Sequence, residues 1–538
     1  MKKAFGLLLI ISIALSAVAQ PKRYTGATFN ATTIAATPKK VSLSLRSFQS
    51  MPSAYTLEPW CPTPGNHGNH GTCVAFANGY GIGTILYAKH HNITDKTIID
   101  KYAYSATHLY ERIKSADDKD CKFGSDPIKA LWLMADSGNA LNRTVPYVCG
   151  TYISQQAKDE APNYKIKDAT ILFAAKGMLT TDMFVVEPQM AIDLTKKALL
   201  EGTPVSTGFH LPESFFSIKT DVWYTSAADT LSDWKHNGHA MAIVGYDDNK
   251  AGGAFRVLNS WGTAWADKGY VWIRYKDFTK WCVLAMQVFG SDFTPMPEEL
   301  KPKPEPNPAP QPQPEPAPKP EPKPEPKPEP QPEFITVLNG SVEFKLNTGE
   351  DMPVTKISSR NLVVEEDVTT YKEDLVAYTM MNTYNSGTKF RFYLNTETEA
   401  YIYAFATDLT GKINRILPYD DVTSTHVGSN TVIAFPSDTK VIKLDENKGT
   451  DYLLILFSKE KINVNELMQA MNNVKGGLSQ KIITALSSKL VAKEKISYDP
   501  VKTAFQLQRK GNRNLTVADE AEALIGSLVP LMVEIKHQ

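Results

Sequence analysis

The stretch that decides the interpretation of this chain is Asn66-His67-Gly68-Asn69-His70-Gly71-Thr72-Cys73-Val74-Ala75-Phe76. Thr72 is a residue type favoured at helix N-caps, so the sequence predicts that Cys73 lies in the first turn of a helix. The unpaired N–H groups and the positive dipole end there favour a thiolate over a thiol. A nucleophilic cysteine also needs a general base and a group that orients the base, so we expect a histidine and its partner elsewhere in the chain.

Length and charge limit the classes of function. At 538 residues the chain is too long for one ordinary domain, so two or three are expected. Lysine and arginine number 58, as do aspartate and glutamate, which gives a net charge of zero. This balance argues against nucleic acid and against an anionic membrane surface as partners.

The first 19 residues predict a signal peptide. Lys2 and Lys3 precede the apolar run 7–15, and Ala17-Val18-Ala19 fits a small-residue cleavage site before Gln20. A transmembrane anchor would need about 20 apolar residues, and this run is shorter. We therefore expect an exported protein, periplasmic or extracellular, with no integral membrane segment once the signal peptide is removed.

Five cysteines occur, at positions 61, 73, 121, 149 and 282. An odd number in an exported protein leaves one free thiol, for which Cys73 is the natural candidate. The other four allow three pairings. We favour Cys121 with Cys149 and Cys61 with Cys282.

The chain divides by its patterns into a helical part and a β part, followed by a proline-rich segment. Residues 20–56 are polar and predict an extended lead-in to a domain at 57–295. Helices are expected at 73–90, 101–114, 127–136 and 189–201, and strands at 203–209, 240–246, 253–258 and 269–275.

Residues 296–333 predict a linker. Every second residue from Pro302 to Pro332 is proline, 16 of the chain's 35. Such a segment favours an extended polyproline helix, which at about 3.1 Å per residue would separate its flanks by up to roughly 100 Å. The alternative is a docking ligand for a proline-binding module.

Residues 334–538 predict a β-rich, sandwich-like domain with a helical appendage. Tyr401, Tyr403 and Phe405 alternate along one expected strand, whereas Leu467 and Met471 have helical spacing. This part contains no cysteine, and its only histidines are His426 and His537. The sequence shows no catalytic cluster there.

The best candidate for the base is His239. It lies at the mouth of the apolar strand 240–246, whereas most of the other histidines have no visible partner. Asn259 follows a second strand and precedes the indole of Trp261, which could shield it from water. An amide that accepts a hydrogen bond from one ring nitrogen fixes the imidazole tautomer and leaves the other nitrogen to face the thiol.

Three blocks carry a resemblance to a known family: Gly71-Thr72-Cys73-Val74-Ala75-Phe76, Gly238-His239-Ala240 and Asn259-Ser260-Trp261-Gly262-Thr263. They resemble the signature blocks of papain-family cysteine peptidases, in a bacterial exported branch. The resemblance implies an α+β, two-lobe fold with a helical lobe and a β-barrel-like lobe. It also implies Cys73 as nucleophile, His239 as base and then acid, and Asn259 as the orienting group, with Trp261 over the Asn–His hydrogen bond.

The C-terminal part carries a second resemblance, in residues 401–418 and 453–457. It is similar to a domain of unknown function that is appended to bacterial papain-like and caspase-like peptidases. We expect that this domain could bind an envelope or protein partner.

The chain departs from the papain pattern in four places. His67 stands where the family has the glutamine that donates to the oxyanion, and a neutral imidazole can still donate one N–H. Val74 replaces an aromatic residue, and His70 replaces a cysteine of a familiar disulfide. Only 53 residues separate Gln20 from Cys73, too few for the family's usual long inhibitory propeptide, so we expect little or no activating cleavage.

The sequence therefore favours an exported thiol peptidase that acts on peptide or protein substrates, with no cofactor and no metal. The alternative is a papain-fold module with little or no turnover, acting in binding or adhesion at the cell envelope. A zinc site formed by His67, His70 and Cys73 is disfavoured, because no fourth ligand with the usual spacing is present.

Overall fold

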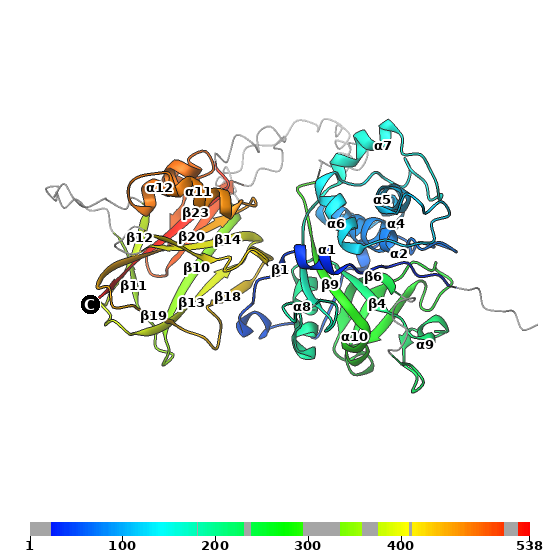
Figure 1. The fold of residues 1–538 in the computed structure, drawn as a ribbon, viewed down its shortest axis with the longest axis horizontal. Helices are drawn as coiled ribbons and strands as arrows, with labels where there is room; N and C mark the ends of the chain where they lie inside the picture. Colours follow the sequence, from blue (N-terminus) through cyan, green and yellow to red (C-terminus); the bar gives the residue numbers. More distant parts are fainter. Residues whose placement is uncertain are drawn as a thin grey trace, which may run out of the picture.

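The computed structural model describes residues 23–179, 181–230, 238–293, 334–357, 375–407, 412–510 and 526–538. The expected signal peptide and the expected proline-rich linker lie outside the described residues. The described part combines helices and sheets: a mixed α and β region over 23–293 and a β-rich region with a few helices over 334–538 (Figure 1). None of the described helices is both long and apolar enough to cross a bilayer.

The N-terminal segment contains more regular structure than the extended lead-in that its sequence predicts. Its elements are short: α1 (Ala31–Ala36), β1 (Lys39–Lys40), η1 (Leu45–Phe48), β2 (Ala54–Thr56) and η2 (Glu58–Trp60). Asn30 caps α1 by accepting a hydrogen bond from the Thr32 N–H at 2.7 Å, which explains why a helix begins there.

One side of the 23–293 region is helical. It comprises α2 (Cys73–Ala75), the π-helical stretch η3 (Phe76–Gly83), α3 (Thr84–His90), α4 (Lys96–Lys101), α5 (Ala106–Ile113), α6 (Pro127–Asp136), α7 (Gln155–Glu160) and η4 (Ala161–Tyr164). The helix predicted at 101–114 is present as α5 but begins only at Ala106, and α4 before it is a separate helix. Ser105 accepts a hydrogen bond from the His108 N–H at 2.9 Å and so starts a new helix.

The other side is built on a sheet. Its elements are β3 (Ile166–Ala174), α8 (Pro188–Leu200), β4 (Val205–His210), α9 (Glu213–Phe216), β5 (Val222–Trp223), β6 (Gly238–Asp247), η5 (Lys250–Gly252), β7 (Ala254–Leu258), β8 (Tyr270–Arg274), α10 (Tyr275–Trp281) and β9 (Cys282–Gly290). Figure 1 shows the helical side above the sheet side, with the dark-blue N-terminal segment between them. One hydrophobic core of buried residues joins both sides.

The C-terminal region is a sandwich of two sheets. Its strands are β10 (Phe334–Leu346), β11 (Val354–Lys356), β12 (Val376–Met380), β13 (Lys389–Thr396), β14 (Ala400–Thr407), β15 (Ile413–Leu417), β16 (Thr423–Ser424), β17 (His426–Val427), β18 (Thr431–Phe435), β19 (Ile442–Lys443), β20 (Gly449–Ser458), β21 (Ser497–Tyr498), β22 (Ala504–Lys510) and β23 (Leu528–His537). One sheet has the order β18-β13-β10-β22-β21, and the other β11-β12-β23-β20-β14-β15.

The alternation along β14 divides its side chains between two cores. Ile402 and Ala404 join the core between the sheets, whereas Tyr401, Tyr403 and Phe405 pack under α11 (Val464–Asn472) and α12 (Leu478–Leu486). A short helix, η7 (Lys493–Lys495), completes the region. The alternation predicted along β14 is therefore present, and both faces of this strand are covered, one by the opposite sheet and one by the helices.

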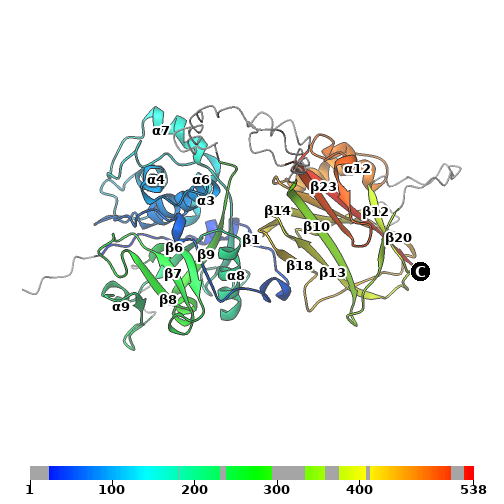
Figure 2. The ribbon, with the colours of Figure 1, turned by 180° about the vertical axis from the view of Figure 1, so that it is seen from behind.

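Strand β1 connects the two regions. It pairs in parallel with β3 of the first region and with β16 of the second, through Lys39 opposite Ile171 and Thr423. The mixed sheet therefore runs β16-β1-β3-β9-β4-β6-β7-β8-β5 without a break between the regions. Figure 2, from behind, also shows β1 between the two halves.

The cysteine pairing agrees with the prediction in one case and contradicts it in the other. Cys121 and Cys149 form a disulfide with their Cα atoms 6.0 Å apart. Cys61 and Cys282 are not paired: both are buried free thiols, directed at the backbone carbonyls of Leu57 (3.5 Å) and Leu284 (3.4 Å). Each sulfur thus has its own acceptor, and burial raises the pKa of the Cys61 thiol to about 12.

Candidate active site

Cys73 is the first residue of α2 and is completely buried. The Ala240 N–H approaches its sulfur at 3.5 Å, so the start of β6 lies directly against the thiol. Thr72 occupies the N-cap position, but its side chain does not cap the helix. The prediction that Cys73 lies in the first turn of a helix is confirmed, and the Thr72 hydroxyl is bound to the Tyr147 hydroxyl at 2.8 Å.

The helix behind Cys73 depends on glycines for close packing. α2, η3 and α3 follow one another without interruption from Cys73 to His90. A Cβ atom on Gly83 would lie 2.5 Å from the Tyr104 ring, so a larger residue would push the helix that begins at Cys73 away from its neighbour. The π-helical stretch also widens the helix shortly after Cys73, a feature that is frequent at functional sites.

His239 and Asn259 meet because β6 and β7 are antiparallel neighbours. His239 is near the start of β6 and Asn259 follows the end of β7, so both lie at the same edge of the sheet. The His239 Nε2 atom lies 2.7 Å from the Asn259 Oδ1 atom, which also accepts the Ser260 N–H at 2.8 Å. The amide oxygen only accepts, so Nε2 carries the proton and Nδ1 is the basic nitrogen.

The Nδ1 atom of His239 is buried and has no hydrogen-bond partner among the described residues. Trp261 stacks on the imidazole, with ring centroids 4.9 Å apart and planes at 28°, and so excludes water from the His–Asn pair. Asn259 can therefore hold the ring while Nδ1 remains available for a proton.

His67 is joined to the same cluster through Trp261. The indole N–H of Trp261 donates to His67 Nε2 at 3.1 Å, and the His67 and His239 ring centroids are 6.0 Å apart. Since Nε2 accepts, a neutral His67 carries its proton on Nδ1. That atom is buried and has no partner among the described residues, and burial, followed by the His239 charge, lowers the pKa of His67 to about 3.

A segment of the N-terminus, residues 23–29, covers this site. The Ala27 N–H donates to the Gly238 carbonyl at 2.9 Å, and the Ser125 N–H donates to the Gly26 carbonyl at 2.8 Å. The Trp261 indole N–H also reaches the Tyr24 carbonyl at 3.3 Å. The segment therefore bridges the helical side and the sheet side directly over the catalytic candidates.

Glycines let the segment approach this closely. A Cβ atom on Gly238, beside His239, would lie 2.1 Å from the Ala27 carbonyl oxygen. Phe29 places its ring where a Cβ on Gly208 would be and contacts His210 with ring centroids 5.6 Å apart. The short N-terminus thus lies against the candidate catalytic residues, although the sequence predicts that it is too short for the family's usual long inhibitory propeptide.

The covered site holds its two key groups in neutral forms. Burial raises the pKa of the Cys73 thiol to about 11, although backbone groups including the Ala240 and Gly26 amides oppose the rise. Burial lowers the pKa of His239 to about 4, although the hydrogen bond that its Nε2 donates to Asn259 opposes this shift. The thiolate expected from the helix start is therefore disfavoured while the segment is in place, because desolvation outweighs the helix dipole.

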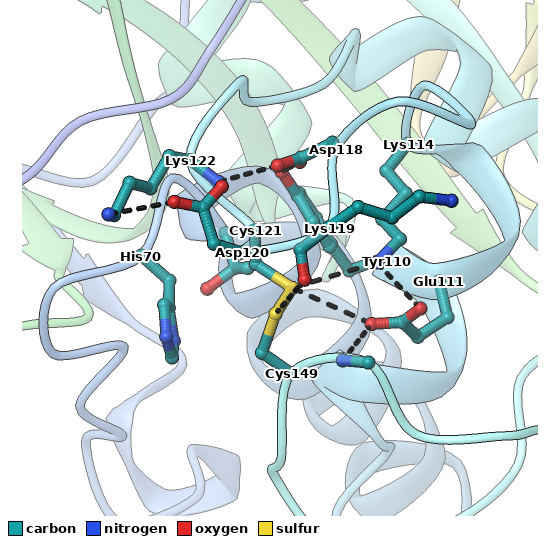
Figure 3. Close-up of a disulfide and its surroundings, with 12 residues drawn as sticks. His70, Tyr110, Glu111, Lys114, Asp118, Lys119, Asp120, Cys121, Lys122 and Cys149 are labelled. Atoms are coloured by element: carbon teal, nitrogen blue, oxygen red, sulfur yellow. Dashed lines mark hydrogen bonds and ion pairs between the residues drawn. A yellow bond between two sulfur atoms is a disulfide. The ribbon is translucent and has the colours of Figure 1, made fainter.

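The zinc arrangement that we disfavoured does not form. His70 Nδ1 lies 2.9 Å from the Tyr147 hydroxyl, and His67 Nε2 is occupied by Trp261. Among the described residues, Glu111, Cys121 and Cys149 are the group close enough to hold a metal ion. Figure 3 shows that the two sulfurs are joined as a disulfide, so neither can be a thiolate ligand.

The structure brings together all four residues that the sequence singled out: Cys73, His239, Asn259 and His67. Two features were missed. Tyr147, which binds the loop before Cys73, belongs to no motif in the sequence, and residues 23–29, which lie against the site, are polar and show no periodicity. The glycine at position 26 was the one available signal, since glycine permits close backbone approach.

Comparison with known proteins identifies the two regions. Residues 63–291 match the model of the papain family of cysteine proteases, and residues 383–461 match a domain of unknown function, DUF4384. The chain therefore contains a papain-family cysteine protease domain followed by a DUF4384 domain.

Individual relatives match over short stretches. An uncharacterized peptidase C1-like protein of Acanthamoeba polyphaga mimivirus is 38% identical over 87 residues, 16% of this chain and 27% of that protein. A cathepsin L-like peptidase of Aedes aegypti is 35% identical over 111 residues, 20% of this chain and 32% of that protein. The chain thus spans about a third or less of the length of these curated relatives.

Among solved structures, xylellain, a cysteine protease from Xylella fastidiosa, is 19% identical and covers 50% of this chain and 95% of its own, with a TM-score of 0.38. A procathepsin B from Trypanosoma congolense is 17% identical and covers 50% of this chain and 87% of its own, with a TM-score of 0.36.

Proposed function

We propose that this protein is an exported cysteine peptidase that hydrolyses peptide bonds with Cys73, His239 and Asn259. One observation carries the proposal. The 2.7 Å bond from His239 Nε2 to Asn259 Oδ1 commits one ring nitrogen and leaves Nδ1 free in the same buried site as the Cys73 thiol. A thiol, a base and a group that orients the base are the parts that thiol catalysis requires.

The reaction follows from these parts. His239 Nδ1 takes the Cys73 proton, and the thiolate attacks the substrate carbonyl carbon to form a tetrahedral oxyanion. The C–N bond then breaks, and the leaving amine takes the proton from His239, which leaves a thioester on Cys73. Water next gives a proton to His239 and attacks the thioester, and the proton returns to the sulfur as the acid product leaves.

The oxyanion needs N–H donors, and His67 is a candidate for one of them. The hydrogen bond from the Trp261 indole to His67 Nε2 places the ring proton on Nδ1. That Nδ1–H has no acceptor among the described residues. With a pKa of about 3, the ring stays neutral at physiological pH, so it donates without carrying a full charge. The backbone N–H of Cys73 would be the second donor.

Catalysis also requires that residues 23–29 leave the cleft. Gly26 is hydrogen-bonded to Ser125, and Ala27 to Gly238. These bonds hold the segment where a substrate backbone would have to bind. Their release would let water reach the site, which lowers the thiol pKa and raises the imidazole pKa. The covered form is therefore a latent state of the peptidase.

Export is supported by two separate features. Residues 1–19 have the composition of a signal peptide. The Cys121–Cys149 disulfide suits an oxidising compartment such as the periplasm or the extracellular space.

The test is labelling and turnover in the full chain. A thiol-directed epoxide such as E-64 should modify Cys73, identified by peptide mapping, and a broad peptide library should be cleaved by the wild type and not by Cys73→Ala. Cys282→Ala is the matched control, because that thiol is equally buried but outside the site. Absence of both labelling and cleavage, including after removal of residues 23–29, would favour the binding or adhesion module instead.

A further inference from the structure

One hydroxyl group binds three residues of the loop that precedes the nucleophile. The Tyr147 oxygen lies 2.9 Å from the His67 carbonyl oxygen, 2.9 Å from His70 Nδ1 and 2.8 Å from Thr72 Oγ1. All three contacts fall within the seven-residue stretch 66–72, which directly precedes Cys73. Among the described contacts, no other single atom of the site binds three residues of this loop.

The protons of this network can be arranged in one way. A carbonyl oxygen only accepts, so Tyr147 must donate its single proton to His67. Its two lone pairs then accept from the His70 Nδ1–H and from the Thr72 hydroxyl. Burial raises the pKa of Tyr147 to about 12, so the phenol keeps the proton that this arrangement requires.

Tyr147 is itself held firmly. Its ring packs edge-on against Phe76, with centroids 4.8 Å apart, on the nucleophile helix. Two residues further on, Cys149 is bonded to Cys121, and the Cys121 carbonyl accepts the Gly71 N–H at 2.7 Å. The disulfide in Figure 3 therefore fixes both supports of the loop, the Tyr147 hydroxyl on one side and the Cys121 carbonyl on the other.

We propose that Tyr147 is a positioning residue for catalysis, which fixes the loop 66–72 so that His67 and the Cys73 backbone N–H present their donors to the oxyanion. This rests on the proposed peptidase function. Tyr147 does not touch the reacting atoms; it acts through the His67 carbonyl and through Thr72, next to the nucleophile. A displacement of about 1 Å in such a donor can reduce the rate by about 100-fold.

The test is Tyr147→Phe in the full-length protein, which removes the hydroxyl and keeps the ring against Phe76. We expect kcat to fall by about 10- to 100-fold, because oxyanion donors act in the transition state, while KM changes by less than about threefold. Tyr152→Phe is the matched control: it is a tyrosine of the same segment, 83% exposed, and should retain wild-type kcat.

A double-variant cycle separates positioning from a general structural role. Because Tyr147 acts partly through His67, Tyr147→Phe combined with His67→Ala should lose less than the product of the two single losses. Wild-type kcat in Tyr147→Phe, or losses that multiply in the double variant, would overturn the proposal.

A second measurement does not depend on turnover. Hydrogen exchange of the peptide covering 66–76 should be faster in Tyr147→Phe than in Tyr152→Phe, and equal exchange would overturn the claim that the hydroxyl holds the loop. Failure of the peptidase proposal would be seen separately: a variant that lacks residues 23–29 and is otherwise unchanged would cleave no peptide.

Discussion

The reactivity of Cys73 depends on how much water reaches its thiol. The sulfur lies at a helix start, which favours the thiolate, but complete burial raises its pKa to about 11. His239 is held near a pKa of about 4 by the same cause, so the two groups do not form an ion pair in the covered state. Desolvation therefore decides the protonation of both residues.

The first prediction concerns pH. Alkylation of Cys73 by iodoacetamide in the intact chain should rise about tenfold per pH unit from pH 7 to pH 10, because only the thiolate reacts and its fraction grows until the pH reaches the raised pKa. Mass spectrometry of the peptide containing Cys73 measures the rate. A rate that is already independent of pH near 7 would contradict the raised pKa.

The second prediction concerns His67. His67→Gln should retain or increase peptidase activity, since an amide N–H can replace the imidazole N–H, whereas His67→Ala should lower kcat by about 10²- to 10³-fold, as expected for the loss of one oxyanion donor. The comparison requires kcat for all three proteins on one peptide substrate. Equal rates would remove His67 from the oxyanion site.

At the scale of elements, the short segment before α1 lies against the candidate site. It runs between the helical side and the sheet side, and Thr28 completes its pairing by donating its N–H to the Ser125 carbonyl at 3.0 Å. The Arg23 guanidinium adds a contact 5.1 Å from the centre of the Trp261 ring. A few backbone hydrogen bonds, each contributing about 1 kcal/mol, hold the segment in place, so its release needs no unfolding of the core.

The third prediction is that Ala27→Pro opens the site. Proline removes the N–H that donates to Gly238, so Cys73 should be alkylated faster at pH 7, by about 10-fold. Ala31→Pro is the matched control, because Ala31 is exposed at the first position of α1, where proline is tolerated. A faster reaction in both variants, or in neither, would argue against a specific role for the Ala27 bond.

The elements around the site differ in how far sequence could predict them. The helix from Cys73 and strands β4, β6, β7 and β8 follow from apolar runs and turn residues; β6 carries His239, and Asn259 directly follows β7. The segment 23–29 could not be predicted, because its structure comes from backbone pairing with distant strands and loops and leaves no periodic pattern. The prediction of a Cys61–Cys282 disulfide is wrong for a similar reason, because spacing in the sequence does not show which thiols meet in space.

At the scale of the whole molecule, a buried charge network ties the protease domain to the C-terminal region. The Glu201 carboxylate binds Lys40 at 3.0 Å, Lys197 at 3.3 Å and Gln287 at 2.6 Å, and it accepts a hydrogen bond from Thr431 of β18 at 3.1 Å. Lys40 lies on β1, the strand shared by both regions, and also donates to Gln287. Since these groups are almost completely buried, each depends on the others for its charge compensation.

The fourth prediction follows from this burial. Glu201→Gln should lower the free energy of unfolding by about 3–5 kcal/mol, because it leaves the Lys40 ammonium buried without its carboxylate. Thermal denaturation measures the effect. Asp221→Asn is the matched control, since its pair with Lys250 is 48% exposed on the aspartate side and should contribute little. Similar losses in both variants would contradict the account of the network.

The central claim is that Cys73 attacks the substrate carbonyl and carries the acyl group. The most direct measurement is to mix a full-length protein carrying Ala27→Pro with a peptide ester, quench it in acid within seconds, and locate any acyl adduct by mass spectrometry. The account predicts a thioester mass on the peptide containing Cys73, removable by hydroxylamine and absent in Cys73→Ala. An adduct on another residue, or cleavage of the ester with wild-type rate in Cys73→Ala, would contradict it.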